Sequence, residues 1–153
     1  MSYAKRPGET IHFDTAGPFG GSINGERYAV VGIDEATGFI TVCINRSKGS
    51  KAAAIALEKA CHTMSTHGYR VTQVHSDQGT EFAGEFKAKC AAYLIEQTFS
   101  ETYSPWQNGR AERAWQTLNA IMHCMLWHAR LELVDAIWGD AILHAADLAN
   151  IVF

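Results

Sequence analysis

The sequence has few features of a protein held together by disulfides or by a structural metal. Its 153 residues include four cysteines, and no two of them form a C-x-x-C pair. His62 and His67 lie close together, but no cysteine pair accompanies them at the spacing of a zinc finger. We therefore expect reduced, buried thiols and an intracellular setting, with four unpaired cysteines: Cys43, Cys61, Cys90 and Cys124.

Long apolar runs and an excess of positive charge are also lacking. No run approaches the ~20 apolar residues of a membrane helix, and the polar start MSYAKRPGET lacks the apolar core of a signal peptide. Lys and Arg number 13 against 16 Asp and Glu, which gives a formal net charge of −3. Strong non-specific binding of nucleic acid depends on basic side chains that displace counterions from phosphates, so it is not expected of this chain alone.

What is present is the pattern of one globular domain with mixed elements. The hydrophobic fraction of 47% and the charged fraction of 19% are ordinary for such a domain. Short β-branched runs predict strands, and apolar residues with a helical period predict helices. The predicted order is strands at 11–15, 28–33 and 39–44, a helix at 50–66, a strand at 71–75, a helix at 81–94, a short strand at 97–99, and helices at 108–130 and 134–151. This order predicts an α/β fold in which helices flank a mixed five-stranded sheet.

Three carboxylates lie where that fold would use them. Asp14 stands on the first strand in IHFDTAG, Asp77 ends the fourth strand in VTQVHSDQGTEF, and Glu112 lies in the first turns of the third helix in NGRAERAWQTL. Each has a plain structural explanation, because a strand-end carboxylate often caps a turn and one near a helix N-terminus complements the helix dipole. For each carboxylate taken by itself, the structural explanation is about as good as a functional one.

The apolar pattern of the third helix indicates on which side of that helix Glu112 lies. Glu112 falls on the edge of its apolar stripe, beside the expected sheet, and Gln116, Asn119 and His123 follow it along one polar flank. Arg113 points to solvent. The stripe comprises Ala111, Ala114, Trp115, Leu118, Ile121, Met122, Met125, Leu126 and Ala129.

Three converging carboxylates require a cation. At ~4 Å and an effective dielectric near 20, each close pair costs about 4 kcal/mol. Carboxylate oxygens are the ligands that Mg²⁺ and Mn²⁺ prefer, and two such ions are a known device for in-line displacement at phosphorus. The pattern therefore predicts a site for Mg²⁺ or Mn²⁺, with two ions when substrate is bound.

Taken together, these segments resemble the catalytic core of retroviral and LTR-retrotransposon integrases. The run HSDQGTEF and the glutamate of SPWQNGRAERAWQTL, with 34 residues between Asp77 and Glu112, resemble the Asp-Asp-x35-Glu signature of that family. IHFDTAGPF resembles the first-aspartate segment and VVGIDEATGFI the hairpin after it. The tail DAIWGDAILHAADLANIVF resembles the Trp-containing helix of copia-type elements. The resemblance covers residues 9–153, and residues 1–8 are expected to be a leader.

The resemblance implies a ribonuclease-H-like fold and a metal-dependent polynucleotidyl transferase. Such an enzyme processes the 3′ ends of element DNA and joins them to target DNA. It implies that Asp14, Asp77 and Glu112 coordinate the metal. It also implies a dimer of cores, no membrane, and a nuclear or virus-like-particle location in a eukaryotic retroelement. Expected DNA contacts are Gln107 and Asn108 before the third helix, and Gln116 and Asn119 on its flank, where many integrases carry phosphate-binding lysines.

Alternatives remain at this point. Glu81 is a second candidate for the third carboxylate, but it is expected to begin the second helix and matches a non-catalytic family position. Asp34 is interpreted as a turn residue. In family members a zinc-binding segment precedes the core and a basic segment follows it, so we expect an excised core. Rival functions are a domesticated, non-catalytic module that binds DNA or protein, a ribonuclease H or transposase, and a structural scaffold.

Overall fold

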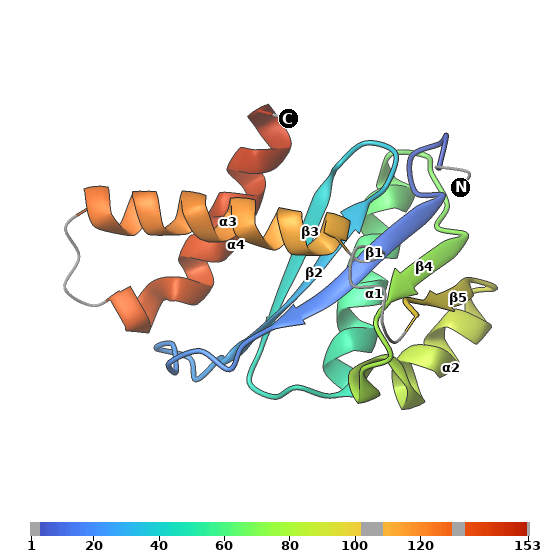
Figure 1. The fold of residues 1–153 in the computed structure, drawn as a ribbon, viewed down its shortest axis with the longest axis horizontal. Helices are drawn as coiled ribbons and strands as arrows, with labels where there is room; N and C mark the ends of the chain where they lie inside the picture. The colour runs from blue at the N-terminus through green and yellow to red at the C-terminus, as the bar shows by residue number, and fades with distance from the viewer. Residues whose placement is uncertain (1–3, 102–108, 130–133, 153) are drawn as a thin grey trace.

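A mixed five-stranded sheet forms the centre of the protein (Figure 1). The computed structural model describes residues 4–101, 109–129 and 134–152. The strands are β1 (Thr10–Ala16), β2 (Tyr28–Asp34), β3 (Ile40–Asn45), β4 (Gln73–Ser76) and β5 (Glu96–Phe99). The helical segments are α1 (Ser50–Thr66), the 3-10 turn η1 (Thr80–Phe82), α2 (Gly84–Ala92), α3 (Gly109–His128) and α4 (Val134–Val152). The predicted fold class is confirmed.

The direction of the strands determines which strand ends, and which loops after them, lie at the same edge of the sheet. The order across the sheet is β3-β2-β1-β4-β5, with β2 antiparallel to both β1 and β3, and β4 parallel to both β1 and β5. Four strands, β1, β3, β4 and β5, therefore run the same way. Their carboxyl ends lie at one edge, which is where α/β proteins commonly build their sites.

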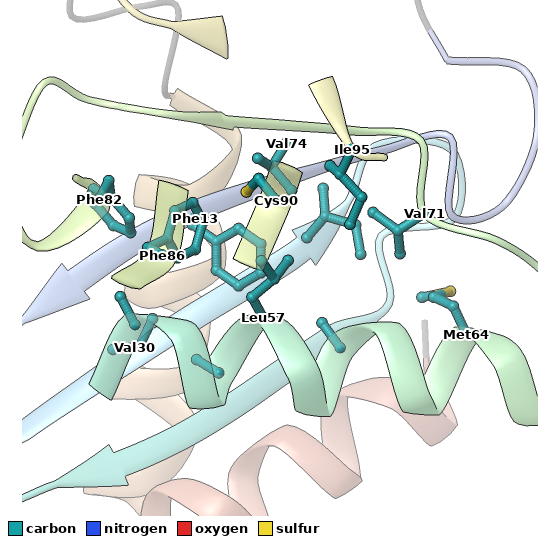
Figure 2. Close-up of a cluster of buried hydrophobic side chains, with 14 residues drawn as sticks. Phe13, Val30, Leu57, Met64, Val71, Val74, Phe82, Phe86, Cys90 and Ile95 are labelled. Atoms are coloured by element: carbon teal, nitrogen blue, oxygen red, sulfur yellow. The ribbon is translucent and has the colours of Figure 1, made fainter. Parts of the chain in front are cut away.

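Two hydrophobic clusters hold the helices to the two faces of the sheet. One cluster joins the sheet to α1, η1 and α2, and Figure 2 shows its side chains. At its centre, the ring of Phe86 meets those of Phe13 and Phe82 edge-on, at centroid distances of 5.7 and 5.2 Å, a favourable aromatic geometry. The other cluster joins the opposite face to α3 and α4. Both layers are visible in Figure 1.

The second helix differs from its prediction at both ends. The segment predicted as one helix over 81–94 is divided into η1 and α2 by Ala83, which is extended, and α2 begins at Gly84, whose φ is +48°. The helix ends at Ala92 because Leu94 adopts a left-handed conformation at φ +57° and the Ile95 N–H donates to the Cys90 carbonyl at 2.8 Å. Glycine usually occupies that position, so the sequence carried no signal for this end.

Side chains of α4 secure the edge strand and the loop after β1. The Asn150 amide donates to the Ile40 carbonyl at 2.7 Å and accepts from the Ile40 N–H at 2.8 Å, so it satisfies backbone groups of an edge strand. The Trp138 indole N–H donates to the Gly20 carbonyl at 2.8 Å, and its ring packs on Phe19. No helix in the described part of the chain is long and apolar enough to cross a membrane.

The packing of α3 on the sheet generates a stability prediction. Leu118 is fully buried in the second cluster, so Leu118→Ala should lower the free energy of unfolding by about 2–5 kcal/mol. The neighbouring Thr117 is exposed, and Thr117→Ala should change it by no more than about 0.5 kcal/mol. Urea unfolding followed by circular dichroism measures both. Equal effects of the two substitutions would contradict the placement of α3.

Candidate active site

The pairing of β1 with β4 places Asp14 and Asp77 together. The parallel register aligns His12 with His75, and each aspartate lies two residues further along its chain. Since side chains alternate along a strand, Asp14 is on the face of His12, which is opposite to the face of Phe13. Asp77 directly follows the last residue of β4, at the same carboxyl edge. The sequence prediction that a strand residue and a strand-end residue would meet rests on this register.

Asp14 lies in an acidic environment. It is half-buried, and its Oδ1 accepts the Thr15 N–H at 2.9 Å. Burial raises the pKa of the Asp14 carboxyl, the Thr15 N–H opposes this, and the carboxylates of Asp77, Glu112 and Glu81 raise the pKa further. All three are therefore within electrostatic range of Asp14. The arrangement disfavours the charged form of Asp14 until a cation offsets the repulsion.

Glu81 lies beside Asp77 instead of pointing to solvent. A Cβ built on Gly79 would lie 2.5 Å from Glu81 Oε2 and 2.8 Å from Asp77 Oδ1, so both carboxylates face the same small space. The Gly79 N–H donates to Asp77 Oδ1 at 2.9 Å. Glu81 is buried within η1, and its Oε1 lies 3.3 Å from Lys48 Nζ. Its burial and its cationic partner were not predicted from the sequence.

Glu112 lies in the first turn of α3 and is exposed. The apolar stripe beside it is buried as predicted at Ala111, Ala114, Leu118, Met122 and Leu126, whereas Ala129 beyond the helix end is exposed. The first turn is fastened to the sheet by Arg110. Its Nη1 donates to the Glu35 carbonyl at 3.1 Å, and its Nε lies 3.9 Å from Glu35 Oε1. Helix packing and this tie hold the first turn of α3 at the sheet, and the Glu112 carboxylate raises the pKa of Asp14.

Two histidines, His12 and His75, lie side by side on β1 and β4, each two residues before an aspartate of the site. His12 Nε2 lies 3.3 Å from Glu35 Oε2, and the His12 and His75 rings are 5.1 Å apart. His75 bonds to the hydroxyls of Thr98 and Ser100. Burial lowers the pKa of both histidines, so the neutral form is favoured. Sequence reasoning missed this pair of histidines, although strand alternation would have placed both rings on the face of Asp14.

Asp34 is a structural residue, as interpreted from the sequence. It is buried at the end of β2 and accepts the Thr37 N–H at 3.0 Å and the Thr37 hydroxyl at 2.6 Å, as a turn residue does. It also accepts the Gly8 N–H at 2.8 Å, which attaches the N-terminal segment to the sheet. Its bonds are therefore accounted for without a ligand.

The expected DNA contacts are placed only in part. Gln116 is exposed and Asn119 is half-buried, both on α3. Gln107 and Asn108 lie outside the described residues. The polar flank expected after Glu112 is therefore present on the helix surface, and its contact with DNA stays a prediction.

The donor set fits a hard divalent cation. Asp14, Asp77, Glu81 and Glu112 offer only carboxylate oxygens, the ligands of Mg²⁺ and Mn²⁺, and no thiolate that would select zinc. Within the described ranges, no three His, Cys, Asp or Glu side chains are already gathered as a metal-binding group. Asp77 and Glu112 are exposed, and the carboxylates of both raise the pKa of Asp14.

The raised pKa of Asp14 generates a prediction about pH. The folded state disfavours the ionised carboxyl, so the wild type should lose stability relative to Asp14→Asn as pH rises from 3.8, the ordinary pKa, through the raised value. Below pH 3.8 the two proteins should unfold alike, and at pH 7 the variant should be the more stable. Metal-free thermal unfolding across pH measures the difference. A variant that is less stable at pH 7 would contradict the acidic environment.

Comparison with known proteins supports the architecture. A solved structure of the simian T-cell lymphotropic virus intasome in complex with PP2A regulatory subunit B56 gamma matches with a TM-score of 0.82 at 18% identity. The match covers 100% of this chain and 52% of that one. It confirms the ribonuclease-H-like arrangement of a mixed sheet with flanking helices.

Sequence comparison identifies the family. An uncharacterized protein of Caenorhabditis elegans, K02A2.6, is 35% identical over 113 residues, which is 73% of this chain. The chain spans only 8% of that protein's length. The family model described as integrase core domain matches residues 4–105, a stretch that includes Asp14 and Asp77 and ends before Glu112. With two aspartates of the predicted signature inside that match, and the fold that carries them, the chain belongs to the integrase core domain family.

Proposed function

We propose that this chain is the catalytic core of an integrase, a divalent-metal-dependent polynucleotidyl transferase that processes DNA 3′ ends and joins them to target DNA. The observation that carries the proposal is the acidic environment of Asp14. This half-buried carboxyl has its pKa raised by burial and by the carboxylates of Asp77, Glu112 and Glu81, which follow β4, lie in the first turn of α3 and lie in η1 respectively. A fold that keeps such repulsion needs a cation to relieve it.

Asp14, Asp77 and Glu112 would hold the metal. One oxygen of each aspartate is oriented by a backbone N–H, from Thr15 for Asp14 and from Gly79 for Asp77, so the carboxylates are positioned before a cation arrives. When bound, two Mg²⁺ or Mn²⁺ ions supply charge neutralisation and an activated oxygen for in-line displacement at phosphorus. No side chain of the site needs to be the nucleophile, because water or a DNA 3′-hydroxyl attacks. Positioning is the main contribution of the protein.

DNA would be the substrate and a second core the partner. The flank of α3 that follows Glu112 offers Gln116 and Asn119 to DNA, and Gln107 and Asn108 precede it in sequence. These amides can donate to phosphate oxygens without adding charge, which agrees with a net charge of −3. The matched structure is named an intasome in complex with a PP2A regulatory subunit, and an assembly of this chain is part of the proposal.

One observation favours a second candidate, a non-catalytic module that binds DNA or protein with the same fold. The carboxylates of the described residues do not already form a metal-binding group. In that case Asp77 and Glu112 would remain solvated surface residues and would not converge on a cation. The two candidates differ in their response to metal and in their chemistry, so two experiments separate them.

Metal binding should stabilise the wild type. Mn²⁺ or Mg²⁺ at 100 times its dissociation constant adds ~2.7 kcal/mol, which corresponds to a rise in Tm of about 5–10 °C for a domain of this size. Asp77→Asn removes one repulsive charge and one ligand, so it should unfold at a higher temperature without metal and respond less to it. Glu85→Gln, on the exposed first turn of α2, is the matched control and should respond as the wild type does. An unmoved wild-type midpoint, with and without duplex DNA, would favour the non-catalytic module.

Chemistry should depend on Glu112. Glu112→Gln keeps the size of the side chain and removes its charge, so 3′ processing and strand joining of a labelled DNA duplex should fall by at least about 100-fold. Glu85→Gln should retain both activities, and both variants should stay folded because both side chains are exposed. An RNA–DNA hybrid tested in parallel identifies a ribonuclease, which would cleave the RNA and join nothing. Undiminished joining by Glu112→Gln would remove that residue from the site.

A further inference from the structure

The connection between β3 and α1 has the opposite charge to the candidate active site. It carries Arg46 and Lys48, Lys51 follows in the first turn of α1, and no Asp or Glu occurs between Glu35 and Glu58. Arg46, Lys48 and Lys51 are exposed. In a chain with a net charge of −3, this is a local concentration of positive charge.

The fold brings this connection to the acidic edge. Because β3 runs in the same direction as β1 and β4, Lys48 leaves the sheet at the edge where Asp14 and Asp77 lie. The packing there is close, since a Cβ built on Gly84 would stand 3.0 Å from the Ser50 hydroxyl oxygen. The start of α1 and the segment from η1 to α2 are therefore held against each other.

Lys48 and Glu81 form an ion pair across this contact. Their charged atoms, Nζ and Oε1, are 3.3 Å apart, and the side chains are 48% and 5% exposed respectively. A buried carboxylate that also neighbours Asp77 is costly without a cation. The ammonium group of a lysine has three N–H donors. About half of the Lys48 side chain, 48%, faces solvent. The ion pair therefore holds the positively charged ammonium group of Lys48 at the margin of the acidic site. Its N–H groups can also donate to a second acceptor.

We propose that Lys48 binds a DNA backbone phosphate next to the candidate active site, and that Glu81 is the positioning residue that holds it there. This inference rests on the proposed function, since it supplies the phosphate contact that an acidic site needs. Metal ions would neutralise the scissile phosphate, but neighbouring phosphates would still face Asp14, Asp77 and Glu112. A lysine held beside Glu81, which itself neighbours Asp77, offsets that repulsion. It lies on a different element from the α3 flank, where lysines are absent.

The test is the salt dependence of DNA binding. The affinity of the 153-residue chain for a 20-base-pair duplex is measured by fluorescence anisotropy in Ca²⁺ between 50 and 200 mM salt. Each phosphate contact contributes about 0.9 to the slope of log affinity against log salt, so Lys48→Gln should lower the slope by that amount. Over this range the variant should lose roughly three- to fourfold less affinity than the wild type. Lys48→Arg should keep the wild-type slope.

Lys87→Gln is the matched control, because Lys87 is exposed on α2 and its loss changes the net charge equally. It should keep the wild-type slope. If Lys48→Gln and Lys87→Gln give the same slope, Lys48 contacts no phosphate and the proposal is wrong. If the unpaired Glu81 prevents folding of Lys48→Gln, the double variant Lys48→Gln/Glu81→Gln removes both charges and should show the same lowered slope.

Glu81→Gln tests the positioning role, because two explanations predict opposite results. If Glu81 is only a negative charge near DNA, its removal should tighten binding. If it positions Lys48, its removal should weaken binding and lower the slope, although the chain has gained positive charge. A wild type that neither cleaves DNA nor responds to metal overturns the proposed function instead, whereas an active wild type with an unchanged Lys48→Gln slope overturns only this inference.

Discussion

The parallel pairing of β1 with β4 is the constraint on which the candidate site depends. Parallel strands need a crossover connection, and here α1 provides it by crossing one face of the sheet between β3 and β4. The crossover covers Phe13 and Val74 on that face, which leaves the opposite face of the same strands to His12, His75 and Asp14. A shift of one residue in this register would move Asp14 to the buried apolar face. The apolar core on one face thus fixes the acidic site on the other.

Electrostatic repulsion at this edge is reduced by three different means. Backbone N–H groups of Thr15 and Gly79 each donate to an aspartate, and such bonds favour the charged form of a carboxylate. Lys48 balances Glu81 directly. Asp77 and Glu112 are exposed, and water screens their repulsion. Asp14 is half-buried, and burial and the neighbouring carboxylates together raise its pKa.

Elements with a local signal were predictable and those set by tertiary contacts were not. The bounds of α1 match the prediction because its alanine-rich period ends just before Gly68. The start of α2 at Gly84 and its end at Ala92 depend on two residues with positive φ, Gly84 and Leu94, and no local pattern marks them. In the site, Asp14 and Asp77 follow from strand alternation. The ion pair of Glu81 with Lys48 does not, because it joins two connections that are distant in sequence and neighbours only in the fold.

The position of Glu112 illustrates why spacing along the chain is a weak guide to this site. Between Asp77 and Glu112 the sequence has 34 residues, one fewer than the commonest family pattern. The glutamate, however, is placed by α3, whose buried stripe packs on the sheet with α4 and whose first turn is tied to Glu35 by Arg110. Glu35 in turn bonds to His12 and to the Thr10 carbonyl of β1. Glu112 is thus placed by contacts at the start of α3 and along its length, and the number of residues before the helix does not by itself fix where the carboxylate lies.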